Sequence, residues 1–322
     1  MLSFEFNGKS SEEYNLIVTT IEENDSLESR SLQLGEKNKY RPRENHFGAI
    51  YDNNYTFTVS VIKNPCRSNI LPKLTDEGTL IYEATLPSLN NGVLTFPRGY
   101  YADVTSGNMY VRDIDYFTSS DIRKISAWLT SPQYPRLFKF IGSDYFQEEI
   151  EYFATITSIE TENVGFPCEL KFTVTCDAPF GYSPETIYQG VSRIVISDSG
   201  AIGMEPYDVV INNNSDCYED YIYPVIKLEI TDDSTINITN QTDNGSISFD
   251  AKQGDHICID SKMLKVYNYV TNKAIPLSQL GITDVANIYW PRLCYGENNI
   301  FITGNANVTI SYREYRKAGV FA

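Results

Sequence analysis

Hydrophobic residues recur at spacings of three and four along residues 118–130, and this period predicts a short helix with one apolar face. Thr118 and Asp121 have the spacing of a capping box, which places the carboxylate near the positive end of the helix dipole. Pro132 prevents the helix from continuing. The apolar face consists of Ile122, Ile125, Trp128 and Leu129. We therefore expect one amphipathic helix that packs on another element.

The residues that follow predict the partner of this helix. Residues 150–156 and 169–176 are rich in β-branched and aromatic side chains, and the second run alternates strictly between apolar and polar. Its apolar face consists of Leu170, Phe172, Val174 and Cys176. The link at residues 160–167 contains turn residues and is long enough for a hairpin. The helix is therefore expected to pack on an antiparallel sheet.

The first sixty residues also favour strands. The Asn7-Gly8 pair after a short strand at residues 4–6 favours a tight hairpin, because both positions tolerate a positive φ angle. Residues 55–61 alternate perfectly and predict another half-buried strand. By contrast, residues 25–45 are polar and charged with little periodicity. This segment is either a solvated loop or an arm that needs a neighbour.

The second half of the chain has a different pattern. Short alternating runs recur about every ten residues with turn residues between them, which is typical of a sandwich of antiparallel sheets. The runs are residues 225–230, 234–238, 246–249, 256–259, 264–267, 299–302 and 307–312. At 322 residues the chain is also long for a single core. We predict two domains, residues 1–185 and 186–322.

Three groups of residues share their order and spacing with a known family. The first is a helix that ends in Ile125, Trp128 and Leu129 and is followed by two long strands. The second, at the end of the last strand, is Cys176, Pro179, Phe180 and Tyr182. The third comprises an Asn-rich turn before Pro224 and the run at residues 290–300. In these features the chain resembles the distal tail (Dit) proteins of long-tailed phages that infect Gram-positive bacteria, with residues within 66–110 as an insertion.

This resemblance implies a mainly β fold. The N-terminal domain would be β-barrel-like, with one helix and an extended arm or hairpin, and the C-terminal domain an antiparallel sandwich like those of galectins and carbohydrate-binding modules. Residues 25–45 would be the arm that reaches the adjacent subunit.

The resemblance also implies a structural, non-enzymatic function. The protein would form a hexameric ring, the baseplate hub, at the distal end of the tail of a virion assembled in the host cytoplasm. Its implied partners are the tail tube protein on one face, the tail-tip or tail-associated lysin protein on the other, and receptor-binding proteins on the sandwich. DNA would pass through the lumen without specific binding.

The charge balance fits proteins, rather than nucleic acids, as partners. Lys and Arg total 26 against 42 Asp and Glu, so the net charge is -16. Binding to phosphates depends on clustered Lys and Arg, and a ring of this protein is expected to have a net negative lumen. The sequence has no membrane-length apolar run and no secretory signal at its start, so we expect folding in a cytoplasm, no membrane partner and six reduced cysteines.

Residues with metal-binding or catalytic chemistry are few. The chain has two histidines, His46 in a predicted charged loop and His256 at the start of a predicted strand, and neither has the spacing of a zinc motif. The adjacent acids at 148–149 and 232–233 point to opposite faces of an extended chain and form no natural catalytic dyad. We expect no enzyme activity, no metal and no cofactor.

A calcium site is also disfavoured. Asp243, Asp250 and Asp255 supply oxygen ligands, but they lack the alternating loop that a bidentate Glu closes. Nucleotide-binding motifs rich in glycine are not found in the sequence either.

The alternative function is that of a carbohydrate-binding adhesin. Trp290 and Tyr295 are its candidate contacts, since an exposed aromatic ring can stack on a sugar. Tyr289, Asn298 and Asn299 lie next to them in sequence and offer a further ring and amides. Against this reading, a Trp at the end of a strand is more often packed under a loop. A hydrolase is disfavoured further, because histidine is scarce and no nucleophile motif is present.

Overall fold

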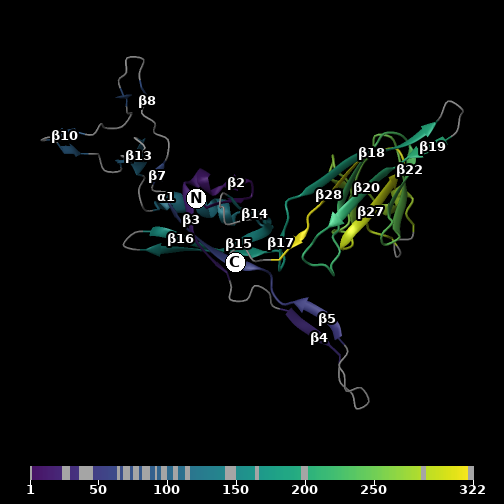
Figure 1. Ribbon diagram of the computed structural model, residues 1–322, viewed down its shortest axis with the longest axis horizontal. Helices are drawn as coiled ribbons and strands as arrows, with labels where there is room; N and C mark the ends of the chain where they lie inside the picture. The colour runs from purple at the N-terminus through teal and green to yellow at the C-terminus, as the bar shows by residue number, and fades with distance from the viewer. Residues whose placement is uncertain are drawn as a thin grey trace, which may run out of the picture. The chain divides into compact units, whose positions relative to one another are not determined.

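The computed structural model describes residues 2–23, 30–35, 46–63, 66–67, 73–74, 80–81, 88–90, 93–95, 100–103, 108–112, 117–141, 150–163, 167–196, 202–283 and 288–317. The chain divides between Phe180 and Gly181 into two compact units (Figure 1). Each unit has its own hydrophobic core. The described residues are mainly β strands, as the sequence predicted.

The first unit is an antiparallel sheet with one α-helix. Its elements are β1 (Ser3–Phe6), β2 (Lys9–Ser10), a 3-10 helix (Ser11–Tyr14), β3 (Leu16–Glu23), β4 (Arg30–Leu34), β5 (His46–Tyr51), β6 (Thr56–Lys63), α1 (Ser119–Thr130), β14 (Arg136–Ile141), β15 (Glu151–Asn163) and β16 (Pro167–Cys176). The strand order in the sheet is β2-β1-β14-β15-β16-β6-β3. The predicted hairpin is thus confirmed as β15 and β16, with Ala154 opposite Cys176.

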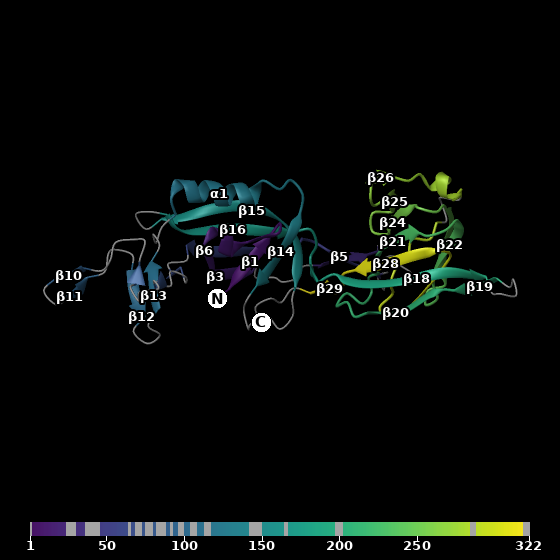
Figure 2. The same ribbon diagram turned by 90° about the horizontal axis from the view of Figure 1, so that it is seen from above.

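Helix α1 begins where the capping box predicted. The Thr118 hydroxyl accepts a hydrogen bond from the Asp121 backbone, and the Asp121 carboxylate accepts one from the Thr118 backbone. The helix lies along β15 and β16 (Figure 2). Its buried residues are Ile125, Trp128 and Leu129, so the predicted apolar face is confirmed.

Trp128 is the centre of the first core. Its ring stacks on Tyr14 at 4.3 Å and on Phe4 at 5.5 Å between ring centroids. Its indole nitrogen donates a hydrogen bond to the backbone carbonyl of Phe6 at 3.1 Å. The strictly alternating run also contributes, since Leu170, Phe172, Val174 and Cys176 are all buried in this core. The amphipathic helix therefore covers the apolar face of the sheet.

Strands β4 and β5 form a separate two-stranded hairpin in which Arg30 is opposite Tyr51. β4 belongs to the segment 25–45, which was interpreted as a loop or an arm. Its other residues, apart from position 35, lie outside the described residues. The histidine at position 46 begins β5, so its placement in a charged loop was wrong. The described part of the segment therefore supplies one strand of a hairpin, whose other strand is β5.

Between β6 and α1 the structure describes short strands. They are β7 (Cys66–Arg67), β8 (Lys73–Leu74), β9 (Leu80–Ile81), β10 (Ser88–Asn90), β11 (Val93–Thr95), β12 (Tyr100–Asp103) and β13 (Asn108–Arg112). The rest of the predicted insertion at 66–110 lies outside the described residues.

The second unit is a sandwich of two antiparallel sheets. Its strands are β17 (Gly181–Tyr182), β18 (Thr186–Ile196), β19 (Ile202–Glu205), β20 (Tyr207–Asn213), β21 (Val225–Ile230), β22 (Ser234–Asn240), β23 (Gly245–Ala251), β24 (His256–Asp260), β25 (Lys265–Asn268), β26 (Lys273–Ala274), β27 (Gly296–Thr303), β28 (Ala306–Tyr312) and β29 (Tyr315–Arg316). A 3-10 helix (Leu277–Leu280) follows β26. The seven-stranded sheet has the order β19-β18-β28-β21-β24-β25-β26 and the four-stranded sheet β20-β27-β22-β23. β17 and β29 pair with each other and belong to neither of these two sheets.

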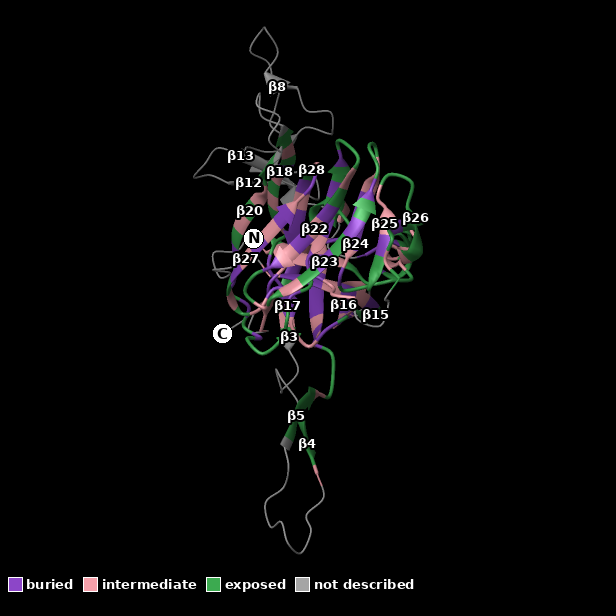
Figure 3. Ribbon diagram, turned by 90° about the vertical axis from the view of Figure 1, so that its right-hand side faces the viewer, coloured by how far each residue is buried: buried purple, intermediate pink, exposed green. Residues whose placement is uncertain are grey.

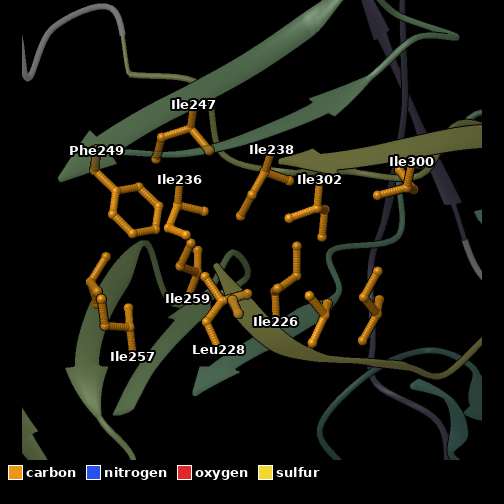
Figure 4. Close-up of a cluster of buried hydrophobic side chains, with 14 of the residues drawn as sticks. Ile226, Leu228, Ile236, Ile238, Ile247, Phe249, Ile257, Ile259, Ile300 and Ile302 are labelled. Atoms are coloured by element: carbon orange, nitrogen blue, oxygen red, sulfur yellow. The ribbon is translucent and has the colours of Figure 1, made fainter. Parts of the chain in front are cut away.

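The core between these sheets is almost entirely aliphatic. Side chains of the four-stranded sheet, such as Ile238 and Ile302, point toward side chains of the seven-stranded sheet, such as Ile226 and Leu228 (Figure 4). This arrangement follows from the alternating pattern, because successive side chains of a strand point to opposite faces. The predicted sandwich is confirmed.

Two further findings concern the whole of the described chain. Its helices include none with the length and hydropathy needed to cross a bilayer. The cysteines whose side chains are described, namely Cys168, Cys176, Cys217, Cys258 and Cys294, are free thiols.

Candidate functional site

An irregular segment of the second unit, residues 289–295, presents several of the candidate residues. It precedes β27 and is joined to residues 221–223 by an isolated bridge between Ile222 and Leu293. The two backbones exchange hydrogen bonds of 3.1 and 2.7 Å at this bridge. Because side chains alternate along extended backbone, Ile222 and Leu293 are buried while their neighbours face outward.

Three buried asparagines hold this segment in place. Each donates from its side-chain amide to one of three consecutive backbone carbonyls: Asn240 to Arg292 (2.8 Å), Asn213 to Leu293 (3.3 Å) and Asn298 to Cys294 (2.7 Å). The Asn298 oxygen also accepts from the Cys294 backbone and from the Asn240 amide. Burying an amide costs free energy unless its hydrogen bonds are satisfied. Here the hydrogen bonds of the three amides fix the backbone conformation of the segment.

A second network fixes the side chains of the segment. The Arg292 Nε atom donates to Asp243 at 2.8 Å, and the Tyr289 hydroxyl lies 3.1 and 3.2 Å from the two oxygens of the same carboxylate. Burial, together with the negative charge of Asp243, raises the pKa of Tyr289. The hydrogen bond to Asp243 raises the pKa of Arg292. Tyr289 is therefore a neutral donor and Arg292 a permanent cation.

Tyrosine rings cover the outward side of this region. Arg292 lies over the ring of Tyr221 at 4.2 Å, and the rings of Tyr218 and Tyr295 meet edge to face at 6.1 Å. The exposed fractions are 66% for Tyr218, 39% for Tyr221, 36% for Tyr223 and 57% for Tyr295. We call these four tyrosines with Arg292 the tyrosine surface.

The residues predicted to contact a glycan differ in their exposure in the structure. Tyr295 is on the tyrosine surface. Trp290 is only partly exposed and packs against the core of the sandwich. Asn298 is fully buried and holds the segment, so the expectation that its amide is available to a ligand was wrong. The side-chain amide of Asn299 donates a hydrogen bond to the side-chain oxygen of Gln241 at 3.4 Å.

Sequence reasoning missed Tyr218, Tyr221, Tyr223 and Arg292. A signal was present in residues 217–224, where the buried Cys217, Ile222 and Pro224 are interleaved with exposed tyrosines. Reading that alternation as a short extended segment would have found the rings. It would not have found Arg292, because its place over Tyr221 depends on the bridge.

The other polar candidates have structural partners. The His256 Nδ1 atom lies 3.2 Å from the Tyr269 hydroxyl. Asp250 accepts from Thr235, and Asp255 accepts from the backbone of Lys252. Across the part of the chain that the structure describes, no three His, Cys, Asp or Glu side chains gather as a metal site would require.

The described residues of the first unit present two further surfaces. The hairpin of β4 and β5 carries exposed apolar side chains, with Phe47 72% and Leu32 62% exposed, and Figure 3 shows both strands as exposed. The second surface is the face of the sheet opposite α1.

That open face of the sheet is rich in hydroxyls. On β16 it carries Thr173 and Thr175, which the register places beside Thr58 and Thr56 of β6. The Thr157 and Thr175 hydroxyls are 3.1 Å apart. The charged residues that the register places on this face of β1, β3, β14, β15 and β16 are Glu5, Glu22, Lys139, Glu151, Glu160, Glu162, Glu169 and Lys171. Carboxylates therefore outnumber the two ammonium groups there.

Comparisons with known proteins agree with this architecture. The model of the family described as phage tail protein N-terminal domain matches residues 1–81 and 95–178, and that described as phage tail C-terminal domain matches residues 204–312. The unmatched residues 82–94 fall within the predicted insertion. Comparison with curated protein sequences gave no match.

One solved structure extends the likeness over the whole chain. It is the SPP1 Dit (gp 19.1) protein, described as a paradigm of the hub adsorption apparatus in phages that infect Gram-positive bacteria. The two chains share 11% sequence identity and a TM-score of 0.53, over 98% of this chain and 99% of the other. At this identity the likeness concerns the fold. The chain belongs to the family of phage tail proteins whose two domain models it matches, and it has the fold of Dit.

Proposed function

We propose that this protein forms a hexameric ring that is the baseplate hub at the distal end of a long phage tail. One face of the ring continues the tail tube, and the other receives the tail-tip or tail-associated lysin protein. The second unit supports receptor-binding components, and DNA passes through the lumen. Assembly takes place in the host cytoplasm. The full-length likeness to the fold of a hub protein supports this assignment.

The observation that carries the proposal is the β4–β5 hairpin. Phe47, Leu32 and Ile50 expose most of their surface on two strands that, among the described strands, form a separate two-stranded sheet. Apolar side chains that are exposed on a hairpin contribute no burial free energy to a monomer. Exposed apolar patches of this kind mark protein interfaces. In the proposed ring the hairpin reaches the adjacent subunit, which covers these side chains.

The open face of the sheet supports a channel. It carries threonine hydroxyls, and its carboxylates outnumber Lys139 and Lys171. A surface of this kind repels phosphates at short range and lacks the clustered cations that retain a duplex. We therefore assign the open face to the lumen, which is net negative in this proposal.

The proposed role of the protein is structural rather than enzymatic. The described residues include no group of metal ligands, and the polar candidates that the sequence singled out serve local structure. Membership of a phage tail family supports a structural role for this protein, and we propose no catalytic reaction.

The test measures assembly directly. The mass of the purified full-length chain is determined by light scattering over a concentration series, with negative-stain images of the same fractions, alone and with the tail tube and tail-tip proteins. The variant Phe47→Asp places a charge on the hairpin, where it is solvated in the monomer and buried in the ring. The matched control is Tyr134→Asp, which changes a similarly exposed ring outside the hairpin.

The expected result is sixfold rings for the natural chain and for Tyr134→Asp, and a monomer for Phe47→Asp. A monomer under all conditions, including mixtures with the tube and tail-tip proteins, overturns the ring. Rings of Phe47→Asp that form as readily as those of the natural chain overturn the role of the hairpin.

A further inference from the structure

The tyrosine surface of the second unit has no task in the ring assignment. Its four rings belong to two segments, 218–223 and 289–295, that are joined by the Ile222–Leu293 bridge. Tyrosine offers an apolar ring for stacking and a hydroxyl for hydrogen bonding, and it loses little conformational entropy when it is bound. The ring of Tyr221 lies against the guanidinium of Arg292, and the rings of Tyr218 and Tyr295 meet each other on the neighbouring residues of the same two segments. Flat apolar area together with polar groups in fixed directions is typical of ligand-binding sites.

The segment is held rigid before any ligand arrives. The three consecutive backbone carbonyls of residues 292–294 accept hydrogen bonds from the side-chain amides of Asn240, Asn213 and Asn298. These amides are buried in a sandwich whose core is almost entirely aliphatic. An apolar residue at any of the three positions would pack more simply, so the amides serve the conformation of the segment. Preorganisation of this kind lowers the entropy lost when a ligand binds.

Arg292 supplies hydrogen-bond donors on this surface. Its Nε atom is used by Asp243, and within the described residues no protein acceptor lies at its two terminal nitrogens. The guanidinium rests on the ring of Tyr221, which fixes its plane. Two donors in a fixed plane beside aromatic rings match the hydroxyls and ring oxygens of a sugar.

The charges around the surface exclude an acidic ligand. Asp243 neutralises Arg292, and Glu219 and Asp220 are exposed between the tyrosines of the first segment. The whole chain carries a net charge of -16. A polyanion would be repelled, whereas the hydroxyls of an uncharged ligand can donate to these carboxylates.

The size of the surface favours a short polymer over a protein. The four exposed fractions amount to about two whole tyrosines, which corresponds to roughly 300–500 Å². A stable protein interface covers about 800 Å² on each partner. A few sugar rings fit the smaller area.

We propose that the tyrosine surface binds a neutral saccharide chain, whose rings stack on Tyr218 and Tyr295 and whose hydroxyls accept hydrogen bonds from Arg292. Of the two glycan contacts expected from the sequence, this site keeps Tyr295 and replaces Trp290, which packs against the core, with Tyr218. It requires no ring assembly, because all of its residues belong to one copy of the second unit.

The test uses the full-length chain and an array of oligosaccharides. The neutral probes are built from hexoses, 6-deoxyhexoses and N-acetylhexosamines, and the acidic probes contain uronate or phosphate. Tyr218→Ala and Tyr295→Ala remove rings that are more than half exposed, so the variants fold, and circular dichroism checks this. Tyr295→Phe keeps the ring, and Tyr134→Ala is the matched control in the first unit.

The expected result is binding of at least one neutral oligosaccharide that weakens tenfold or more in each alanine variant. Tyr295→Phe and Tyr134→Ala keep the affinity within about threefold. Arg292→Gln weakens binding as well and removes discrimination among hydroxyl epimers. The proposal is overturned if no neutral probe binds, if acidic probes bind better than neutral ones, or if the alanine variants bind normally. A protein partner captured by the natural chain but not by Tyr295→Ala, without saccharide binding, assigns the surface to protein contact instead.

Discussion

The ring of Tyr289 lies directly on Gly245: a Cβ atom added at Gly245 would fall 2.0 Å from the Cε2 atom of Tyr289. The same ring reaches Asp243 with its hydroxyl. The start of β23 and the start of the 289–295 segment are therefore packed without space for a methyl group. This contact links the sandwich to the segment that presents the tyrosine surface.

The variant Gly245→Ala is expected to lower the free energy of unfolding by about 1–3 kcal/mol, the usual cost of overpacking. Tyr289 must move, and its contact with Asp243 is weakened. Urea denaturation monitored by tryptophan fluorescence measures the change. Gly203→Ala is the control, since its nearest neighbour would be the Val195 carbonyl oxygen at an ordinary 3.6 Å. Equal stability of the two variants contradicts the packing argument.

Removal of the Asn298 side chain is expected to loosen the same segment. In Asn298→Leu the buried Asn240 amide and the Cys294 backbone lose a partner, at a cost of about 1–3 kcal/mol for each buried group left unpaired. The midpoint of thermal unfolding measures the stability. Limited proteolysis locates the change, with new cleavage expected within residues 289–295. Unchanged protection there means that the amide does not hold the segment.

Truncation of Trp128 tests the core of the first unit. Trp128→Ala removes the stack with Tyr14 and Phe4 and leaves the Phe6 carbonyl without its donor, so a loss of about 3–5 kcal/mol is expected. The chain has two tryptophans, and the remaining Trp290 reports on the second unit. Tyr134→Ala, at an exposed position, is expected to change stability by less than about 0.5 kcal/mol.

The cap of α1 predicts behaviour in acid. Burial opposes ionisation of Asp121, but hydrogen bonds from Thr118 and Lys63 outweigh it, so the pKa of Asp121 is lowered. A lowered pKa stabilises the folded chain above the pKa of the unfolded state, near 3.9, and this stabilisation is lost as the pH falls through the folded value. Asp121→Asn is expected to cost about 0.5–2 kcal/mol at pH 7 and little at pH 2. A cost that does not depend on pH contradicts this account.

The raised pKa of Tyr289 leads us to expect a loss of stability at high pH, whereas the lowered pKa of Asp121 leads to a loss at low pH. Burial raises its pKa, with a further contribution from the Asp243 charge, so the folded chain keeps the phenolic proton after the unfolded chain has lost it near pH 10. Stability is therefore constant below the unfolded value and falls as the pH rises through the folded one. Tyr289→Phe is expected to reduce the fall in unfolding free energy between pH 9 and pH 11. Urea denaturation at each pH measures this, and an unchanged slope excludes Tyr289 as a contributor.

The sequence by itself determined the regular elements. Local spacing was sufficient for α1, because the Thr118–Asp121 cap and the apolar face lie within one short segment. Alternation was sufficient for β16 and for the strands of the sandwich, since a strand with one buried face must alternate. The tight turn at Asn7 and Gly8 could also be predicted, because the signal is the Asn-Gly pair itself. Both residues have positive φ angles in the structure. Each of these features depends on residues close together in the chain.

Only the tertiary structure decided the tyrosine surface. Asn213, Asn240 and Asn298 come from three different strands, and the hydrogen bond from Asn213 to Leu293 spans eighty positions. The sequence suggested that Asn298 faces a ligand, whereas the register of β27 turns it into the core. Arg292 meets Tyr221 because of one isolated bridge. Sequence patterns report which face of an element is buried, but pairing between distant elements depends on the packing of the whole core, and that packing selects which side chains meet at the surface.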